Sequence, residues 1–499
     1  MHLAKTTSAV TSPARTRPLA ASALARPVTV ALALVLTLVL AGCGGGATPD
    51  PDASSATPSA TSPEAGTTDS PPSPEPPAAP GLVQLVSGVS EDGRYLVDEA
   101  GDPLLLRAEA VWSAMQTLTP QEIDEHLALR ASQGFNGVIM HPFPWSGVDT
   151  DSRQTIDGLE PFDGTVANLN EEYWERFDAI LATAASLGIT VFIAPIGLTW
   201  GFEENGYDYD ESLAAQLGEA LGARYADTPG IVWMLGMDYD EVDWDTYDPM
   251  MMSFIDGLRS AGDEHLVTVH LFNPSTSHDN VDWRGVSQIE LAYTYQPTYD
   301  TVLRAYTYGT GPVVLIEGNY ENENNEGGPE TTDESLRRQT LWTLTSGGVG
   351  VSYGERHIWQ FIPPWQDVRQ TQAIAEQTVA VDLFRSFPWW TLVPDADGTF
   401  LVDGQGEAVT AGTQEDGYAD VLESDWATAA ISEDGSLAVV YVPTARTITL
   451  DLSRLAPGVS AAWVDPVSGA RQDTALAEEL TTPGENAGGD EDWLLVIGG

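Results

Sequence analysis

The sequence has little positive charge and almost no cysteine. Its 499 residues contain 21 Lys and Arg against 74 Asp and Glu, and Lys5 is the only lysine. A formal net charge of -53 repels phosphates and anionic lipid headgroups, so nucleic acid and an anionic membrane surface are excluded as direct partners. Cys43 is the single cysteine, so no disulfide can form within the chain and no cysteine is available as a nucleophile downstream.

Motifs of several other enzyme classes are also missing. No GxGxxG or GxxxxGKS/T loop follows an expected strand, which argues against dinucleotide-binding and P-loop folds. The seven histidines form no HExxH motif or other paired-ligand spacing, so we expect no metal and no cofactor. Six acids between Asp238 and Asp248 lack the glycine and the spacing of an EF-hand, which favours a solvated acidic loop over a calcium site.

Residues 1–42 have the pattern of a bacterial signal peptide. Three arginines up to Arg26 precede an uncharged apolar run from Val28 to Ala41, too short for a stable membrane-spanning helix but long enough for a signal sequence. The run ends in Leu40-Ala41-Gly42-Cys43, which resembles the lipobox of bacterial lipoproteins. We therefore expect lipidation at Cys43 and a location on the extracellular face of the cell membrane, with the lipid as the only membrane contact.

Residues 43–80 are expected to form a tether. The stretch consists mainly of Pro, Ser, Thr, Ala and Gly, with ten prolines between Gly44 and Pro80. Because it has too few apolar side chains to offset the entropy of ordering, it predicts an extended, disordered linker.

Short apolar runs alternate with amphipathic stretches from residue 81 to residue 390. After an expected strand pair, Leu82–Val86 with Arg94–Val97, eight runs have strand length. They are Leu104–Ala110, Gly137–His141, Thr190–Ile196, Ile231–Asp238, Leu266–Leu271, Gln288–Tyr295, Pro312–Glu317 and Gly348–Tyr353. Expected helices between them include Thr119–Gln133, which opens with a capping box and a proline at the first helical position. Eight such units predict an α/β fold, a (β/α)8 TIM barrel.

The active site of such a barrel lies at the carboxyl ends of its strands. Carboxylates and aromatic side chains gather there in this sequence, a combination that suits a sugar because carboxylates bind hydroxyls and aromatic rings cover C–H faces. The residues are Glu109, Trp112, His141, Trp145, Trp200, Asp238, His270, Asn273, Tyr293, Tyr295, Gln296, Glu317, Tyr320, Glu321, Glu355, His357 and Trp359.

Asp238 and Glu317 form the most informative pair. Each directly ends a buried run, the fourth and the seventh, and these strands face one another across a barrel mouth. Two carboxyl groups about 5 to 5.5 Å apart are what a retaining glycosidase requires. We interpret Glu317 as the nucleophile and Asp238 as the acid/base. The alternative is that both acids cap helices or pair with arginines.

The other candidates are interpreted as substrate-binding residues. Trp359 is expected to stack on a sugar, and Trp112, on the same rim, is a further candidate for binding it. Glu109 is a candidate ligand for a sugar hydroxyl. Glu321 is either a carboxylate that assists the catalytic pair or part of an acidic loop. His141, His270, Tyr293 and Tyr295 are candidates for orienting the nucleophile. Each of these residues could instead be a satisfied structural group.

Several of these motifs resemble the apiosidase-like family, glycoside hydrolase family 140, formerly a domain of unknown function. They include Arg107–Trp112, Gln133–Asn136, Trp233–Asp238, Glu317 with Tyr320-Glu321, Tyr353-Gly354, Ile358–Gln360 and Phe387–Trp390. The resemblance implies a retaining barrel glycosidase with Asp238 as acid/base and Glu317 as nucleophile. Two positions depart from it. The family commonly has Gly-Asp-Thr at 108–110 and Gly-Gly-Asp at 236–238, and the longer acid at Glu109 leaves open a terminal sugar other than apiose.

Residues 391–499 are expected to form a small antiparallel β-sandwich. Seven short runs separated by turns support this prediction. They are Thr399–Val402, Ala419–Glu423, Ala429–Ser432, Leu437–Val442, Thr447–Leu452, Ala461–Val464 and Trp493–Ile497. The region resembles a module that accompanies the family and carries a collagen-binding label, although a packing or spacer role fits these strands as well.

The sequence thus predicts a surface-anchored retaining glycosidase that removes a terminal sugar from a polysaccharide or oligosaccharide. Two alternatives remain, a non-catalytic carbohydrate-binding lipoprotein and a collagen-binding one. The expected partner is a carbohydrate in the first two cases, and no protein partner can be named beyond collagen in the third.

Overall fold

The computed structural model describes residues 84–143, 154–197, 210–323, 331–409, 411–412 and 418–498. All described residues belong to one compact unit within residues 77–499. The expected signal peptide, Cys43 and the tether lie outside the described residues, as do Trp145 and Trp200. The expectations for them stay predictions.

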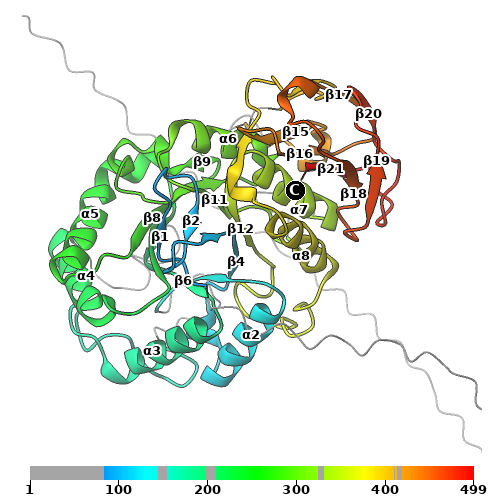
Figure 1. Ribbon diagram of the computed structural model, residues 1–499. Helices are drawn as coiled ribbons and strands as arrows, with labels where there is room; N and C mark the ends of the chain where they lie inside the picture. The colour runs from blue at the N-terminus through cyan, green and yellow to red at the C-terminus, as the bar shows by residue number, and fades with distance from the viewer. Residues whose placement is uncertain are drawn as a thin grey trace, which may run out of the picture. The chain divides into compact units, whose positions relative to one another are not determined.

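Eight parallel strands form a nearly closed barrel surrounded by helices (Figure 1). They are β4 (Leu106–Ala110), β5 (Gly137–Met140), β6 (Thr190–Gly197), β7 (Ile231–Tyr239), β8 (Leu266–Leu271), β10 (Glu290–Tyr293), β11 (Val313–Glu317) and β12 (Gly348–Tyr353). Strands β4 to β8 pair in chain order, as do β10 to β12, and β12 pairs with β4. The seam between β8 and β10 has no ladder, but the Gln288 N–H donates to the Val267 carbonyl across it (2.8 Å).

Helices follow seven of the eight strands. They are α1 (Ala114–Thr117) and α2 (Pro120–Ser132), then α3 (Glu171–Ser186), α4 (Glu211–Tyr225), α5 (Trp244–Ser260), α6 (Thr298–Tyr308), α7 (Asp333–Thr345) and α8 (Gln372–Arg385). The capping box at α2 is formed, because Thr119 accepts from the Glu122 N–H and the Glu122 carboxylate accepts from the Thr119 N–H. No helix in the described ranges is long and apolar enough to cross a membrane.

The fifth unit departs from the expected repeat. The chain after β8 forms the short antiparallel strand β9 (Ser275–Thr276) and two 3-10 turns, η2 (Ser277–Asp279) and η3 (Val281–Trp283), instead of an α-helix. Thr276 and Asp279 close a capping box around η2, and the Asn280 side chain caps η3. These side chain to backbone hydrogen bonds satisfy the backbone N–H groups of the segment locally, and they replace the bonds that a continuous helix would form.

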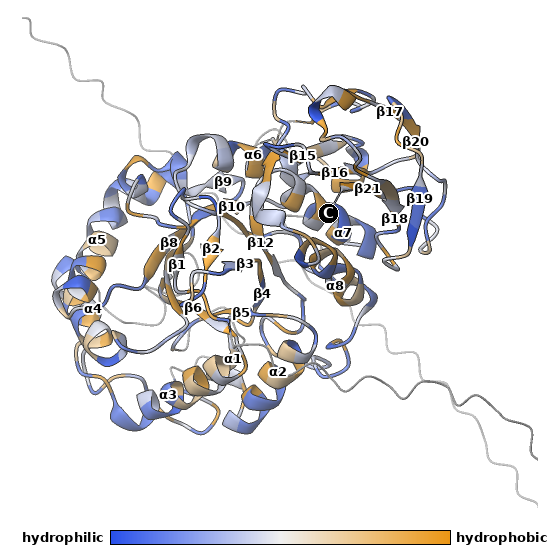
Figure 2. Cartoon of the chain, viewed as in Figure 1, coloured by the Kyte–Doolittle hydropathy of each residue, from blue (hydrophilic) through white to orange (hydrophobic). Residues whose placement is uncertain are grey.

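Alternate residues of the strands face the barrel lumen and the helices. Leu106 and Ala108 of β4 share a hydrophobic cluster with Ile139, Phe192 and Val232 of the next three strands. Residues of the opposite parity pack outward, as Trp233 does against Phe254 of α5 (ring centroids 6.0 Å apart). The strands are correspondingly apolar along their length, whereas the helices carry polar outer faces (Figure 2). This alternation decides which strand-end residues can reach the mouth.

The N-terminal strand pair differs from the expectation. Three short strands are present, β1 (Gly88–Val89), β2 (Leu96–Val97) and β3 (Pro103–Leu104), and β2 pairs with both others. The prediction of a strand at Leu82–Val86 is wrong for its described part, because the Val86 N–H donates to Thr190 Oγ1 of β6 (2.9 Å) rather than to a hairpin partner.

The C-terminal region forms two antiparallel sheets. Six strands have the order β13-β15-β16-β21-β18-β19 and three the order β14-β17-β20. Their bounds are β13 (Leu392–Pro394), β14 (Leu401–Asp403), β15 (Thr428–Ser432), β16 (Leu437–Val442), β17 (Thr447–Leu450), β18 (Ala461–Val464), β19 (Arg471–Thr474), β20 (Glu479–Thr481) and β21 (Trp493–Gly498). The predicted strand Ala419–Glu423 is wrong, because Asp420 caps a 3-10 turn, η6 (Val421–Glu423), by accepting from the Leu422 N–H.

Candidate active site

Asp238 sits on a bulge near the end of β7. Leu235 pairs with Val269 and Tyr239 with Leu271, so three residues of β7 lie opposite His270 alone. The bulge is left-handed, with φ of 104° at Gly236, 59° at Met237 and 54° at Asp238. A Cβ at Gly236 would lie 2.6 Å from the Tyr239 ring, so only glycine fits there. Non-glycine residues in this region cost of order 1–3 kcal/mol each, so the surroundings must impose the conformation.

A buried polar network next to the bulge supplies that constraint. The Tyr239 hydroxyl donates to Asp248 Oδ1 (2.5 Å), and the Trp283 indole N–H reaches both the Tyr239 hydroxyl (2.7 Å) and Asp248 Oδ1 (2.9 Å). The Asn280 amide donates to Asp248 Oδ2 (2.8 Å). Asp248 is therefore buried and bonded, and its place in the expected solvated acidic loop is corrected.

Glu317 is turned into the mouth by an irregularity at the end of β11. Ala292 pairs with Leu315 but Tyr293 pairs with Glu317, which leaves Ile316 as an extra residue. Leu315 packs outward with the α6 residue Val302, so without the shift Glu317 would face outward too. Instead its Oε1 accepts from the hydroxyls of Tyr295 (2.7 Å) and Tyr293 (3.1 Å).

His270 connects the two carboxyl groups. Its Nε2 lies 3.3 Å from Glu317 Oε2, and its Nδ1 lies 3.5 Å from Asp238 Oδ1 and accepts from the Asp238 N–H (3.2 Å). Because the two nitrogens of an imidazole are about 2 Å apart, these contacts keep the two carboxylate oxygens within roughly 9 Å of each other, close enough to flank one glycosidic bond. Burial alone would lower the pKa of His270, but Glu317 and Asp238 outweigh it and raise it.

Aromatic side chains enclose this pair. Burial raises the pKa of Tyr293, Tyr295 and Tyr320 well above the ordinary value, so all three hydroxyls keep their protons and can donate. The Trp112 indole N–H donates to the Tyr320 hydroxyl (2.9 Å), and its ring lies 5.8 Å from the His270 ring.

His141 packs on the other side of Trp112, with ring centroids 5.5 Å apart. Burial lowers its pKa to about 4, so at neutral pH the ring is uncharged and its Nδ1–H donates to the Ala194 carbonyl (3.0 Å). The structure thus brings Trp112, His270, Tyr293 and Tyr295 together around Glu317, with His141 one layer further out.

Glu109 does not reach the mouth, and its interpretation as a hydroxyl ligand is wrong. β4 has no bulge, so Glu109 has the outward parity of Arg107 and is completely buried against α2. Its oxygens bond Arg130 (2.5 Å) and His126 Nε2 (2.7 Å). Burial alone would raise the pKa of Glu109, but Arg130 and His126 outweigh it and lower it to about 2.

Glu321 also bonds to protein groups away from the pair. Its carboxylate accepts from the Tyr353 hydroxyl and from Thr371 Oγ1 (2.8 Å), the capping residue of α8. Tyr353 in turn packs against Phe135 (ring centroids 6.1 Å apart). The structure therefore does not bring Glu321 to the substrate-facing side.

Trp359 is half-buried and bound to an acid that the sequence analysis did not single out. Its indole N–H donates to Glu323 Oε2 (3.2 Å), and the Arg356 guanidinium lies 5.5 Å from its ring centroid. Burial raises the pKa of Glu323, and the charge of Glu317 adds to that effect, so Glu323 borders the site. Nothing in the acidic run from 321 to 326 distinguishes it in the sequence.

In the described ranges, no group of three or more His, Cys, Asp and Glu side chains is arranged to hold a metal ion. What the geometry offers is a pair of carboxyl groups with hydrogen-bond donors around one of them. Two carboxyl groups at the carboxyl ends of parallel barrel strands are the arrangement on which barrel glycosidases depend.

Comparison with known proteins narrows this class. Residues 90–391 match the family model described as "Apiosidase-like, catalytic domain", and the chain belongs to this family. A glycoside hydrolase family 5 crystal structure from Bacteroides vulgatus has a similar fold, with 23% identity and a TM-score of 0.68 over 83% of this chain and 94% of that one. A second structure, described as a glycoside hydrolase, gives 21% identity and a TM-score of 0.68 over 83% and 97%. Comparison with curated proteins gives no match. Family and fold together support glycosidase activity on a carbohydrate.

Proposed function

We propose that the protein is a retaining glycosidase of the apiosidase-like type, within glycoside hydrolase family 140, that removes a terminal sugar from a polysaccharide or oligosaccharide. The observation that carries the proposal is the contact of Asp238 and Glu317 with the two nitrogens of one buried imidazole, His270. Two carboxyl groups this close can flank one glycosidic bond, and the retaining outcome rests on the resemblance to the apiosidase-like family.

In the first step, a Glu317 oxygen attacks the anomeric carbon and the bond to the leaving oxygen breaks. Asp238 donates its proton to that oxygen, which leaves as an alcohol. The Tyr293 and Tyr295 hydroxyls hold the attacking carboxylate in place, since both donate to the same oxygen, Oε1.

In the second step, Asp238 takes a proton from water, the water oxygen bonds to the anomeric carbon, and Glu317 is released. The roles fit the exposure of the two groups, because the Asp238 side chain is 20% exposed and that of Glu317 is 8% exposed. The acid/base must meet both the leaving group and water, whereas the nucleophile must be shielded from water. In the neutral form of His270, Nδ1 accepts the Asp238 N–H, so the ring proton lies on Nε2 and points at Glu317.

We further propose that Trp359, held by Glu323 and Arg356, stacks on the sugar. A hydrogen bond on one edge of an indole fixes the orientation of its faces, so that one face can cover the C–H groups of a sugar.

The proposal for the whole chain includes a barrel domain over residues 81–390, a C-terminal β-sandwich over 391–499 and a lipid anchor at Cys43 on the outer face of the cell membrane. The sandwich is supported by a cluster that joins Ile448 and Leu480 of one sheet to Val440 and Leu495 of the other.

The stereochemistry of hydrolysis tests the mechanism. A panel of aryl glycosides, apiosides and arabinofuranosides included, identifies a sugar that is turned over, and proton NMR in the first minutes then reports the anomer released. The proposal expects the anomer of the substrate. Release of the opposite anomer would exclude Glu317 as nucleophile. If the protein hydrolyses no glycoside of the panel and no natural glycan, the carbohydrate-binding or collagen-binding alternative is favoured.

A further inference from the structure

A cleft lies at the end of the barrel opposite to Glu317. Its volume is about 820 Å³, within the usual range for ligand sites. It is lined by the β1–β2 turn, the start of β12 at Gly348, the turn between β15 and β16, and the 3-10 turn η5 (Trp389–Thr391). Because Gly348 begins β12, whereas Asp238 and Glu317 lie at the carboxyl ends of β7 and β11, the cleft and the candidate active site are separate places.

An exposed tryptophan marks this cleft. Trp390 is 40% exposed, and no other tryptophan in the described ranges is as exposed. It stands perpendicular to Trp389 (90°, ring centroids 5.9 Å apart), and Trp389 packs edge-on to Tyr95 (6.2 Å). Trp390 is thus an apolar surface that packs on the buried Trp389, which in turn packs on the half-buried Tyr95. Exposure of a large ring on a firm support is typical of a binding surface.

Polar groups capable of binding hydroxyls line the same cleft. Asp434 accepts from the Ser432 and Ser436 hydroxyls through Oδ1, and Asp92 accepts from the Ser90 hydroxyl through Oδ1. Within the described part of the chain, no residue donates to the Oδ2 atom of either aspartate. These hydrogen bonds lower the pKa of Asp434 to about 2, so it stays an acceptor at neutral pH.

Arg94 supplies donors in the same cleft. One guanidinium nitrogen donates to the Tyr306 carbonyl (3.0 Å), and the group lies 4.4 Å from the centroid of the Tyr306 ring, which fixes its position. A sugar hydroxyl both donates and accepts, so neighbouring aspartates and an arginine match it. Arg94 is the only basic residue of the lining, against the acids Asp92, Glu433 and Asp434, so anionic chains are disfavoured.

We propose that this cleft is a second carbohydrate site, which binds an uncharged glycan chain with Trp390 under one sugar ring and Asp92, Asp434 and Arg94 on its hydroxyls. The site lies apart from the catalytic pair and performs no reaction. It would hold a polysaccharide on the enzyme between turnovers at the mouth.

Affinity gel electrophoresis with arabinoxylan, galactomannan and dextran tests this site, with polygalacturonate as an anionic probe. The wild-type chain should be retarded by at least one neutral probe and not by polygalacturonate. Trp390→Ala should weaken that retardation at least about tenfold, the loss expected for truncating a central aromatic contact. Asp92→Asn is a second variant, expected to weaken it without removing the ring.

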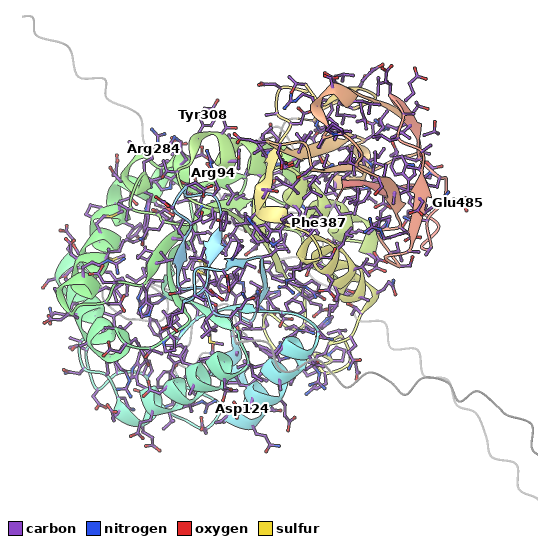
Figure 3. All side chains as sticks on the ribbon, viewed as in Figure 1. Arg94, Asp124, Arg284, Tyr308, Phe387 and Glu485 are labelled. Carbon is purple, nitrogen blue, oxygen red and sulfur yellow. The ribbon has the colours of Figure 1, made fainter. Side chains whose placement is uncertain are left out.

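Tyr308→Ala is the matched control, because Tyr308 is 61% exposed but does not line the cleft. Figure 3 labels both Tyr308 and the cleft residue Arg94. The control should be retarded like the wild type, and Trp390→Ala should hydrolyse a small aryl glycoside at the wild-type rate. The proposal is overturned if no neutral probe retards the wild type, or if Trp390→Ala is retarded equally. Neither result touches the proposed hydrolysis, which the aryl glycosides report separately.

Discussion

The ends of β7 and β11 differ from the end of β4, although all three carry an acid. β4 keeps a regular register, and Glu109 points outward into a buried contact with Arg130 and His126. β7 and β11 each contain extra residues opposite their neighbours, and Asp238 and Glu317 turn into the mouth. A carboxylate after a barrel strand is therefore placed by the local register rather than by its distance from the strand end.

The largest effect should come from Glu317. We expect Glu317→Gln to lower kcat by about 10⁵-fold or more, because removing a nucleophile disables both steps. The thermal midpoint should change little, since the amide keeps the shape of the side chain. Steady-state kinetics on the best aryl glycoside with a calorimetric scan measures both. A variant within tenfold of wild type would place the nucleophile elsewhere.

Asp238→Asn should have the next largest effect, a loss of about 10²–10⁴ in kcat, the usual range for a general acid/base. The loss in the first step should shrink for substrates whose leaving group needs no proton, such as a dinitrophenyl glycoside. Comparing dinitrophenyl and methyl glycosides of one sugar measures this difference. Equal losses on both would contradict the assignment of Asp238 as the acid.

Glu109→Gln should lower stability rather than chemistry. Leaving Arg130 buried without its anion is expected to cost about 3–5 kcal/mol of unfolding free energy. Because the folded pKa of Glu109 lies near 2, below its ordinary 4.5, its ionisation stabilises the fold above pH 4.5, and this contribution is lost as pH falls toward 2. Urea titrations across this window should show the loss in the wild type and not in Glu109→Gln. A glutamine variant as stable as wild type, but with a raised KM, would restore Glu109 as a substrate ligand.

The smallest effect should come from Tyr239→Phe. The hydroxyl contacts neither carboxyl group of the pair, but it fixes the bulge through Asp248 and Trp283. We expect kcat to fall about tenfold with KM unchanged, since a small misplacement of Asp238 costs catalysis more than binding. Trp283→Phe, which also removes one donor, should behave alike. A rise in KM with kcat preserved would show that the network serves binding instead.

Much of the barrel is predictable because buried parallel strands have nearly continuous apolar sequences. The runs Leu266–Leu271 and Gly348–Tyr353 coincide with β8 and β12. The bounds of α6 are hard to read from the sequence, because β-branched and aromatic residues in Thr298–Tyr308 weaken the helical pattern. The absence of a helix after β8 follows from side chain to backbone hydrogen bonds near Thr276 and Asn280. The hydrophobic pattern of the sequence does not show these bonds.

The site was predictable only in part. The placement of Asp238 and Glu317 after opposite strands brings them together, as the barrel requires. The bulges could not be foreseen, because the one at Asp238 depends on Asn280 and Trp283, more than forty residues further along the chain. The outward position of Glu109 could be predicted, since Leu106, Ala108 and Ala110 alternate with Arg107 and Glu109. Its pairing with Arg130 could not be predicted, because Arg130 belongs to another element.

Mass spectrometry of a trapped intermediate tests the central claim most directly. The wild-type chain would be incubated with the 2-deoxy-2-fluoro derivative of the aryl glycoside it hydrolyses best, then digested and sequenced. The account predicts one added fluorosugar, on the peptide that contains Glu317 and on that residue, and no label in Glu317→Gln. A label on Asp238 or any other residue, or retained hydrolysis of the parent glycoside in Glu317→Gln, would contradict it.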